Sequence, residues 1–265
     1  MSEPSGYPHG TPSWCDLGTP DLPAALRFYT GLFGWDAGEP EAGGYTMFSL
    51  AGRPVAAVAP QMQSQLEQGV APAWTTYVTV DDVDEVAGRV EGLGGMLLSP
   101  PFDVLDAGRM AVVTDPSGAP LALWQARGHP GAGVVNEPGS MCWNELTTRE
   151  PDRAASFFEG LLGWEVDRKG EGPGDYREFR RAGESVSVAG CMSMVGPEWP
   201  DWLPSHWMVY FAVEDTDAAA GRAVELGGTV SVPPTDIEPG RFAVLGDPRG
   251  AVFSVLALAP HLQAS

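Results

Sequence analysis

The chain has 265 residues, a net charge of −20 and a hydrophobic fraction of 43%. This length allows one or two domains, and so acidic a chain is a poor match for nucleic acid or anionic membrane surfaces. No apolar run reaches the roughly 18 residues that a membrane-spanning helix needs. Residues 1–10 carry neither the basic nor the apolar segment of a signal peptide, so we expect a cytoplasmic protein.

The first predicted elements are a strand over residues 13–17 and a helix that follows it. Asp21 is placed to cap this helix, and Pro23 lies in its first turn. Apolar side chains then recur at helical spacing, at Leu22, Leu26, Tyr29 and Phe33. Short strands are predicted next, near residues 45–50 and 54–59.

The same order of elements follows a second time. A strand over 75–80 leads into a helix that Asp81 or Asp82 caps, and Gly94 and Gly95 end that helix. Strands are predicted over 95–98, 111–114 and 121–125, with a tight turn at "DPSG" between the last two. Each half of this region is therefore one βαβββ unit.

The whole arrangement is duplicated in the second part of the chain. Three segments recur in order: "FYTGLFGW" (28–35) and "FFEGLLGW" (157–164), "VDDVDEVAGRVEGLGG" (80–95) and "VEDTDAAAGRAVELGG" (213–228), "GRMAVVTDPSGAPLAL" (108–123) and "GRFAVLGDPRGAVFSV" (240–255). The repeat predicts two tandem domains over 11–126 and 139–260, joined by a Gly/Pro-rich linker over 127–138. The four βαβββ units could pair within each domain or across the two.

The ordered motifs "FY..LFGW", "VDDVD", "GG" and "DP.G" resemble the vicinal oxygen chelate superfamily, over about 240 residues. That superfamily includes glyoxalase, bleomycin-resistance proteins and extradiol dioxygenases. The resemblance implies an α+β fold with two cupped mixed sheets, helices on the convex faces and a ligand in each concave face. We call the concave face of the first domain the first cup, and that of the second domain the second cup.

The resemblance also implies where a divalent metal would be held in each cup. In this sequence the corresponding positions are Trp14, Thr75 and Ala122 in the first cup, and Trp143, Met208 and Ser254 in the second. These are not the usual donors to zinc, iron or manganese. Of the four histidines, only His206 lies near a predicted strand. We therefore predict no metal and no cofactor.

Alternation along the strands predicts which side chains line the cups instead. The expected ligand-binding residues are Trp14, Asp16, Tyr77 and Trp124 in the first cup, and Trp143, Glu145, His206, Met208, Tyr210 and Ser254 in the second. Flat molecules stack on such aromatic faces, which also attract cations. Packing of these tryptophans in a core or an interface is the alternative interpretation.

Other repeated or clustered residues favour structural roles. Trp35 and Trp164 end the first helix of each copy and are predicted to be core residues. Arg109 and Arg241 recur in "GR.AV" and are expected to pair with carboxylates near turns. The aromatic loop over 196–207 suits either a lid at a pocket or a plug between domains. The three cysteines are expected to be free thiols.

The function that these observations favour is metal-independent binding of a small flat aromatic molecule, which could be cationic. The setting would be drug sequestration, self-resistance or an accessory role in natural-product biosynthesis, in a monomer or homodimer. One alternative is an enzyme, either a metal-dependent lyase, isomerase or oxygenase, or a metal-free acid–base catalyst that uses Asp16 or Glu145. Another is a structural module whose own side chains fill the cups.

Overall fold

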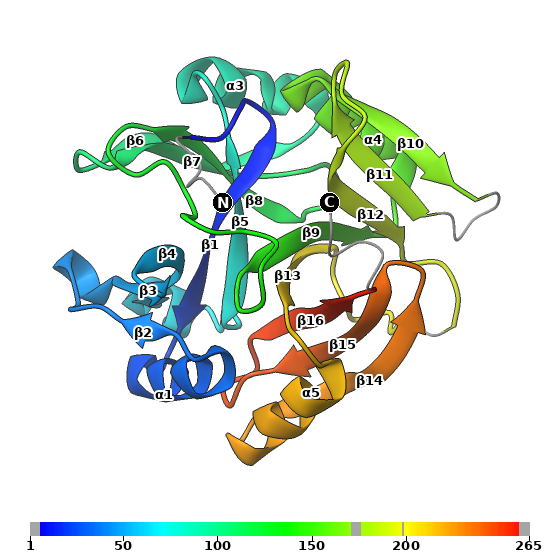
Figure 1. The fold of residues 1–265 in the computed structure, drawn as a ribbon. Helices are drawn as coiled ribbons and strands as arrows, with labels where there is room; N and C mark the ends of the chain where they lie inside the picture. The colour runs from blue at the N-terminus through cyan, green and yellow to red at the C-terminus, as the bar shows by residue number, and fades with distance from the viewer. Residues whose placement is uncertain (1–5, 171–175, 198, 260–265) are drawn as a thin grey trace.

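The computed structural model describes residues 6–170, 176–197 and 199–259, which form two eight-stranded mixed sheets (Figure 1). The first sheet has the strand order β2-β3-β4-β1-β5-β8-β7-β6. The second has the equivalent order β10-β11-β12-β9-β13-β16-β15-β14. The predicted α+β fold with two tandem cupped sheets is thus confirmed.

The elements of the first half follow the predicted order. They are β1 (Thr11–Thr19), α1 (Leu22–Phe33), β2 (Asp36–Ala37), β3 (Thr46–Leu50), β4 (Arg53–Pro60), α2 (Gln63–Glu67), β5 (Ala73–Thr79), α3 (Val83–Arg89), β6 (Met96–Val104), β7 (Gly108–Thr114) and β8 (Pro120–Ala126). Two short 3-10 helices cover Ala42–Gly44 and Glu91–Leu93. Both helix caps lie where capping chemistry requires them, because Asp21 accepts from the Ala24 amide and Asp82 from the Glu85 amide.

The second half repeats this pattern. Its elements are β9 (Met141–Thr148), α4 (Pro151–Leu162), β10 (Trp164–Lys169), β11 (Tyr176–Arg181), β12 (Ser187–Ser193), β13 (His206–Ala212), α5 (Thr216–Glu225), β14 (Thr229–Ile237), β15 (Gly240–Gly246) and β16 (Val252–Leu258). In each half the first strand of one unit pairs antiparallel with the first strand of the other, β1 with β5 and β9 with β13. The four units therefore pair within each half.

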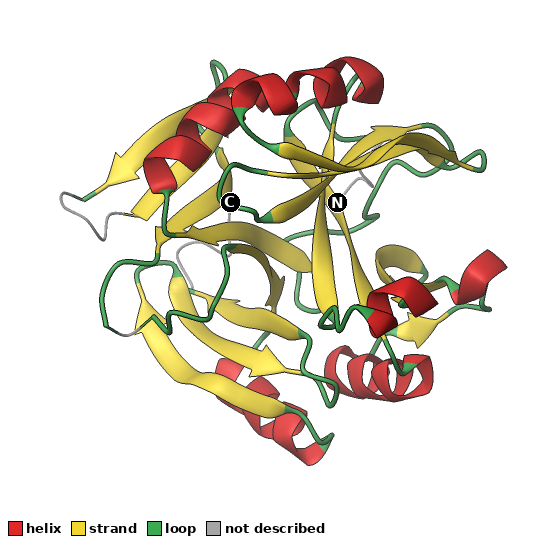
Figure 2. Cartoon of the chain, turned by 180° about the vertical axis from the view of Figure 1, so that it is seen from behind, coloured by secondary structure: helices red, strands yellow, loops and turns green. Residues whose placement is uncertain are grey.

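The two sheets pack back to back through their helix-bearing faces. Figures 1 and 2 show α1 beside α5 at one end of the molecule and α3 beside α4 at the other. Each helix pair closes one large apolar core that contains residues from both halves. At the centre, Thr76 on β5 donates a buried hydrogen bond of 2.8 Å to Asn144 on β9. The concave faces therefore point away from each other.

Trp35 and Trp164 are buried core residues, as predicted, and each also joins the two halves. The indole N–H of Trp35 donates to the Gly139 carbonyl at 2.7 Å, just before β9. The indole of Trp164 donates to the Gly10 carbonyl at 2.8 Å, just before β1. Each half thus holds the segment that leads into the other half.

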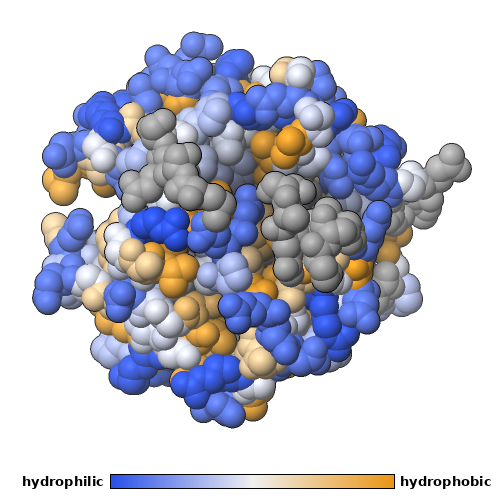
Figure 3. Space-filling model, viewed as in Figure 1, coloured by the Kyte–Doolittle hydropathy of each residue, from blue (hydrophilic) through white to orange (hydrophobic). Residues whose placement is uncertain are grey.

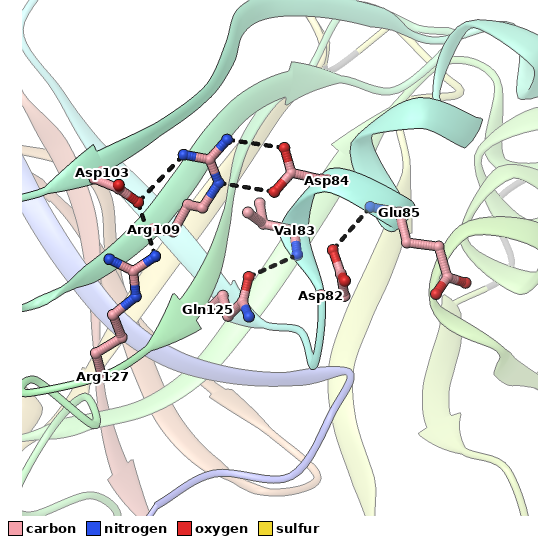
Figure 4. A network of polar contacts seen from close by, with 8 residues as sticks. All are labelled: Asp82, Val83, Asp84, Glu85, Asp103, Arg109, Gln125 and Arg127. Carbon is pink, nitrogen blue, oxygen red and sulfur yellow. Dashed lines mark hydrogen bonds and ion pairs between the residues drawn. The ribbon is translucent and has the colours of Figure 1, made fainter.

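The repeated arginines form equivalent ion-pair clusters. Arg109 contacts Asp84 through two hydrogen bonds of 2.8 Å and also pairs with Asp103, which Arg127 contacts as well (Figure 4). Arg241 makes the same contacts with Asp217 and Asp236. Both arginines tie the first turn of a helix to the hairpin beside it, which is a structural role.

Among the described residues, no helix is long and apolar enough to cross a membrane. On the face seen in Figure 3, hydrophilic residues surround the rim, and many of the apolar residues lie nearer the middle.

Candidate functional site

Four side chains meet in a polar network in the first cup. Trp14 and Asp16 both point to the concave side of β1, opposite Tyr77 and Thr75 of β5. The Tyr77 hydroxyl donates to Asp16 Oδ2 at 2.7 Å. The Trp14 indole donates to the Tyr45 hydroxyl at 3.1 Å, and Tyr45 lies close enough to Asp16 to lower the pKa of its carboxyl.

The surroundings of Asp16 change the pKa of its carboxyl. Burial raises the pKa of its carboxyl to about 6, although the hydroxyls of Tyr77, Thr75 and Tyr45 oppose the rise by donating to the carboxylate. The burial and the negative charge of Asp16 together raise the pKa of Tyr77 well above its ordinary value. Both phenols therefore stay protonated and act as donors.

The second cup contains the same network built from equivalent residues. The Tyr210 hydroxyl donates to Glu145 Oε1 at 3.0 Å, and the Trp143 indole donates to the Tyr176 hydroxyl at 3.0 Å. Tyr176 also lies close enough to Glu145 to lower the pKa of its carboxyl. Burial raises the pKa of Glu145, and the two phenols partly oppose that rise. Each cup thus holds a Trp–Tyr–acid–Tyr network.

Tyr45 and Tyr176 were missed in the sequence. They lie at the start of β3 and β11, within the matching strings "YTMF" (45–48) and "YREF" (176–179). Aligning these strings as a fourth repeated segment would have identified both. A close approach also matters in the second cup, because a Cβ added at Gly190 would lie 2.0 Å from the Tyr176 hydroxyl and 2.8 Å from the Trp143 indole nitrogen. At the matching position on β4, the first half has Ala57.

The other predicted site residues lie on the expected sheet faces but differ in their contacts. Tyr210 pairs across the strands with both Trp143 and Ser254, so these three form a row over β9, β13 and β16. Met208 lies opposite Glu145. His206 lies at the start of β13, where its ring Nδ1 is 2.9 Å from the Pro204 carbonyl of its own loop.

The first cup is covered by the linker. Trp124 donates its indole N–H to the His129 carbonyl at 3.0 Å. The His129 ring packs edge-on against the Trp14 indole, with 4.5 Å between the ring centroids. The Ala132 amide donates to the Ser13 carbonyl at 2.8 Å, and the Gly133 amide to Pro54 at 2.7 Å. Side chains and linker thus fill this cup, which matches the structural alternative for the first half.

The structure contains a cavity of about 230 Å³ beside the second cup. Its lining comes from the residues before and at the start of β1, the end of the linker, and the first residues of β9 and β12. Tyr7, Cys142, Trp143, Ser187 and Val188 are among the residues that line it. Trp143 therefore belongs both to the network and to an accessible surface.

The aromatic loop over 196–207 serves as neither a single lid nor a single plug. Trp207 is part of the core between the sheets, whereas the side chain of Trp202 is 80% exposed. Arg149 holds the loop through the carbonyls of Met194 and Pro200. Glu198 of this loop and His261 lie outside the described residues.

The positions where the fold family would hold a metal do not fit one. The indoles of Trp14 and Trp143 offer no lone pair to a cation, and both are already donors to tyrosines. Within 6–170, 176–197 and 199–259, no group of three or more His, Cys, Asp or Glu side chains is arranged to hold a metal ion.

Comparison with protein families matches both halves of the chain. Residues 11–123 match the glyoxalase/bleomycin resistance protein/dioxygenase superfamily, and residues 141–256 match a glyoxalase-like domain. The chain belongs to this superfamily. The resemblance found in the sequence motifs is therefore confirmed.

Curated relatives cover nearly the whole chain. A Mycobacterium tuberculosis protein named "Putative glyoxylase CFP32" is 48% identical, over 98% of this chain and 100% of its own length. The anthracycline biosynthesis protein DnrV of Streptomyces peucetius is 43% identical, over 94% of each chain. DauV of Streptomyces sp. strain C5, also named as an anthracycline biosynthesis protein, is 42% identical over the same share.

Solved structures share the fold at low sequence identity. A Mn(II)-bound glyoxalase from Novosphingobium aromaticivorans superposes with a TM-score of 0.66 at 16% identity, covering 97% of this chain and 83% of that one. The 2,3-dioxygenase LapB from Pseudomonas sp. KL28 has the same TM-score at 15% identity, covering 94% and 93%. These likenesses concern the fold alone.

Proposed function

We propose that this protein binds a small, flat aromatic molecule without a metal, as an accessory protein in the biosynthesis of an aromatic natural product or in its sequestration. The observation that carries the proposal is the Trp–Tyr–acid–Tyr network of the second cup, whose Trp143 stands where the fold family places a metal ligand. It combines aromatic faces for stacking with a carboxyl group that orients a polar substituent.

Two further facts support this function. Relatives at 42% and 43% identity are named as anthracycline biosynthesis proteins, which supports the proposal of an aromatic natural product as the ligand. The net charge of −20 favours a neutral or cationic ligand over an anionic one.

The direct test is a titration of the protein with flat aromatic antibiotics and polycyclic phenols, followed by tryptophan fluorescence and thermal shift. We expect quenching and stabilisation by some of these compounds, with affinities that do not change after treatment with a chelator. Metal content of protein purified without chelator is measured on the same sample. A stoichiometric metal whose removal abolishes binding would contradict the proposal.

A second candidate is a metal-free acid–base catalyst, and the acidity of Glu145 in the second cup favours it. Burial raises the pKa of this carboxyl, which brings its proton exchange closer to neutral pH. Turnover of any substrate found in the titration should then follow a pH profile with a step above the ordinary pKa of a glutamate. That step should vanish in Glu145→Gln, while the Gln variant still binds the substrate.

A further inference from the structure

The two cups differ in what lies over one equivalent groove. In the first half, this groove runs from Ser13, at the bulge of β1, to Pro54, near the beginning of β4. Linker residues occupy it, and the fit is tight: a Cβ added at Gly131 would lie 2.6 Å from the Ser13 carbonyl oxygen. No open space is left there for a ligand.

The register of the strands identifies the same groove in the second half. Asp16 pairs with Ala57 and Glu145 with Gly190, so Pro54 corresponds to Ser187. The bulge of β1 at Ser13 corresponds to the irregularity of β9 at Cys142. Cys142 and Ser187 both line the cavity of about 230 Å³. The cavity therefore lies where the linker lies in the first half.

The second cup also has a polar group that the first cup lacks. Ser254 is fully buried in the row beside Tyr210, at the position that Ala122 occupies in the first half. Burial raises the pKa of Tyr210, and the Ser254 hydroxyl beside it partly opposes that rise. No group among the described residues meets the distance and angle of a hydrogen bond to this hydroxyl. An unsatisfied buried hydroxyl is costly, and a ligand oxygen that displaces the side chains covering it would satisfy it.

We propose that one flat aromatic molecule binds per chain, in the second cup alone, stacked on Trp143 with a ring-edge oxygen that accepts from the Ser254 hydroxyl. It enters through the cavity beside Cys142. This proposal rests on the proposed function and specifies it: the first cup is structural, and the ligand class is an aromatic ring bearing a hydroxyl or carbonyl oxygen.

The binding test uses 1,4-dihydroxyanthraquinone as the probe and isothermal titration calorimetry for stoichiometry. We expect one site per chain. Trp143→Phe should weaken binding about three- to tenfold, and Ser254→Ala about two- to tenfold. The matched first-cup variants Trp14→Phe and Ala122→Ser should leave the affinity within twofold. Two sites per chain, or a loss confined to the first-cup variants, would overturn the proposal.

A second measurement needs no ligand. Cys142 lines the cavity, whereas Cys15 and Cys191 are buried. N-ethylmaleimide should therefore modify Cys142 first, slowly, because burial raises the pKa of its thiol to about 12. In Ser13→Cys combined with Cys142→Ser, the new thiol lies under the linker and should react at least tenfold more slowly than Cys142.

The two measurements separate the possible failures. Equal labelling of positions 13 and 142 would overturn the difference between the cups, whatever the protein binds. Unequal labelling together with no binding of any aromatic compound would contradict the proposed function and the ligand, but would support the open groove. Protection of Cys142 by the probe, lost in Trp143→Phe, is the result expected if both proposals hold.

Discussion

The buried carboxyl groups are the residues on which the chemistry of both cups depends. Each accepts a hydrogen bond from one phenol and lies beside a second, yet burial still raises the pKa of Asp16 and of Glu145. Two neutral donors stabilise a carboxylate less than a cation would, so desolvation dominates. These carboxyls are therefore suited to gaining or losing a proton in response to what binds beside them.

The raised pKa of Asp16 predicts how stability depends on pH. Because its pKa is about 6 in the folded protein and 3.8 ordinarily, the folded state binds more protons between these values. Its contribution to stability is therefore present at low pH and is lost as pH rises through 6. Asp16→Asn should gain stability over the native chain between pH 4 and 7, by at most about 3 kcal/mol at 1.36 kcal/mol per pKa unit.

Urea unfolding of both proteins at several pH values measures this difference. The gain should be below this ceiling, because Asp16→Asn also weakens the hydrogen bond that Tyr77 donates. Glu39→Gln, at an exposed position outside the network, is the control for removing one carboxyl. A difference between Asp16→Asn and the native chain that stays constant from pH 4 to 7 would contradict the assigned acidity.

At the scale of the elements, the packing of β12 against β9 and β11 decides whether the second network forms. Gly190 leaves the space in which the Tyr176 hydroxyl and the Trp143 indole meet. In the first half, Ala57 occupies the equivalent position, and the Trp14–Tyr45 contact of 3.1 Å still forms. One missing methyl group thus distinguishes two otherwise equivalent elements.

Gly190→Ala should therefore disrupt the second network alone. The added Cβ would lie 2.0 Å from the Tyr176 hydroxyl and must displace that ring. This should lower the free energy of unfolding by about 1–3 kcal/mol. Near-ultraviolet circular dichroism should change, and the affinity for an aromatic ligand should fall about tenfold or more. Ala57→Gly is the matched substitution in the first half, and it should leave ligand affinity unchanged. Equal effects of the two substitutions would contradict this assignment.

The elements were largely predictable from the sequence, whereas their contacts were not. The repeat and the caps at Asp21 and Asp82 located the units, since capping and periodicity are local. The alternation of β1 and β5 also placed Asp16 and Tyr77 on one face. Tyr45 was missed because its partner lies 31 residues away on Trp14, and His129 because no periodicity marks a linker residue.

At the scale of the whole molecule, the two halves are joined by reciprocal contacts. Trp35 and Trp164 each donate a buried hydrogen bond to the segment leading into the other half. The helix pairs α1–α5 and α3–α4 close cores that neither half completes by itself. The halves should therefore unfold together rather than as independent domains.

Trp35→Phe and Trp164→Phe test this coupling. Each change leaves a carbonyl of the other half without its donor. The free energy of unfolding should fall by about 1–3 kcal/mol for this reason, and further because packing is lost. Both variants should keep a single urea transition, seen equally by fluorescence and circular dichroism. Trp202→Phe, at an exposed position, should change stability by less than about 0.5 kcal/mol. A separate early transition in the native chain would contradict the coupling.

The position of the linker has a consequence for how the duplicated chain can diverge. Two identical subunits in a symmetric dimer have identical surroundings, but one peptide that joins them cannot contact both in the same way. Here that peptide hydrogen-bonds to Ser13 and packs on Trp14, whereas only its end borders the cavity beside their counterparts. Covalent fusion alone therefore makes the copies inequivalent. Substitutions in the first cup must then preserve packing against the linker, while the second cup can change with its ligand.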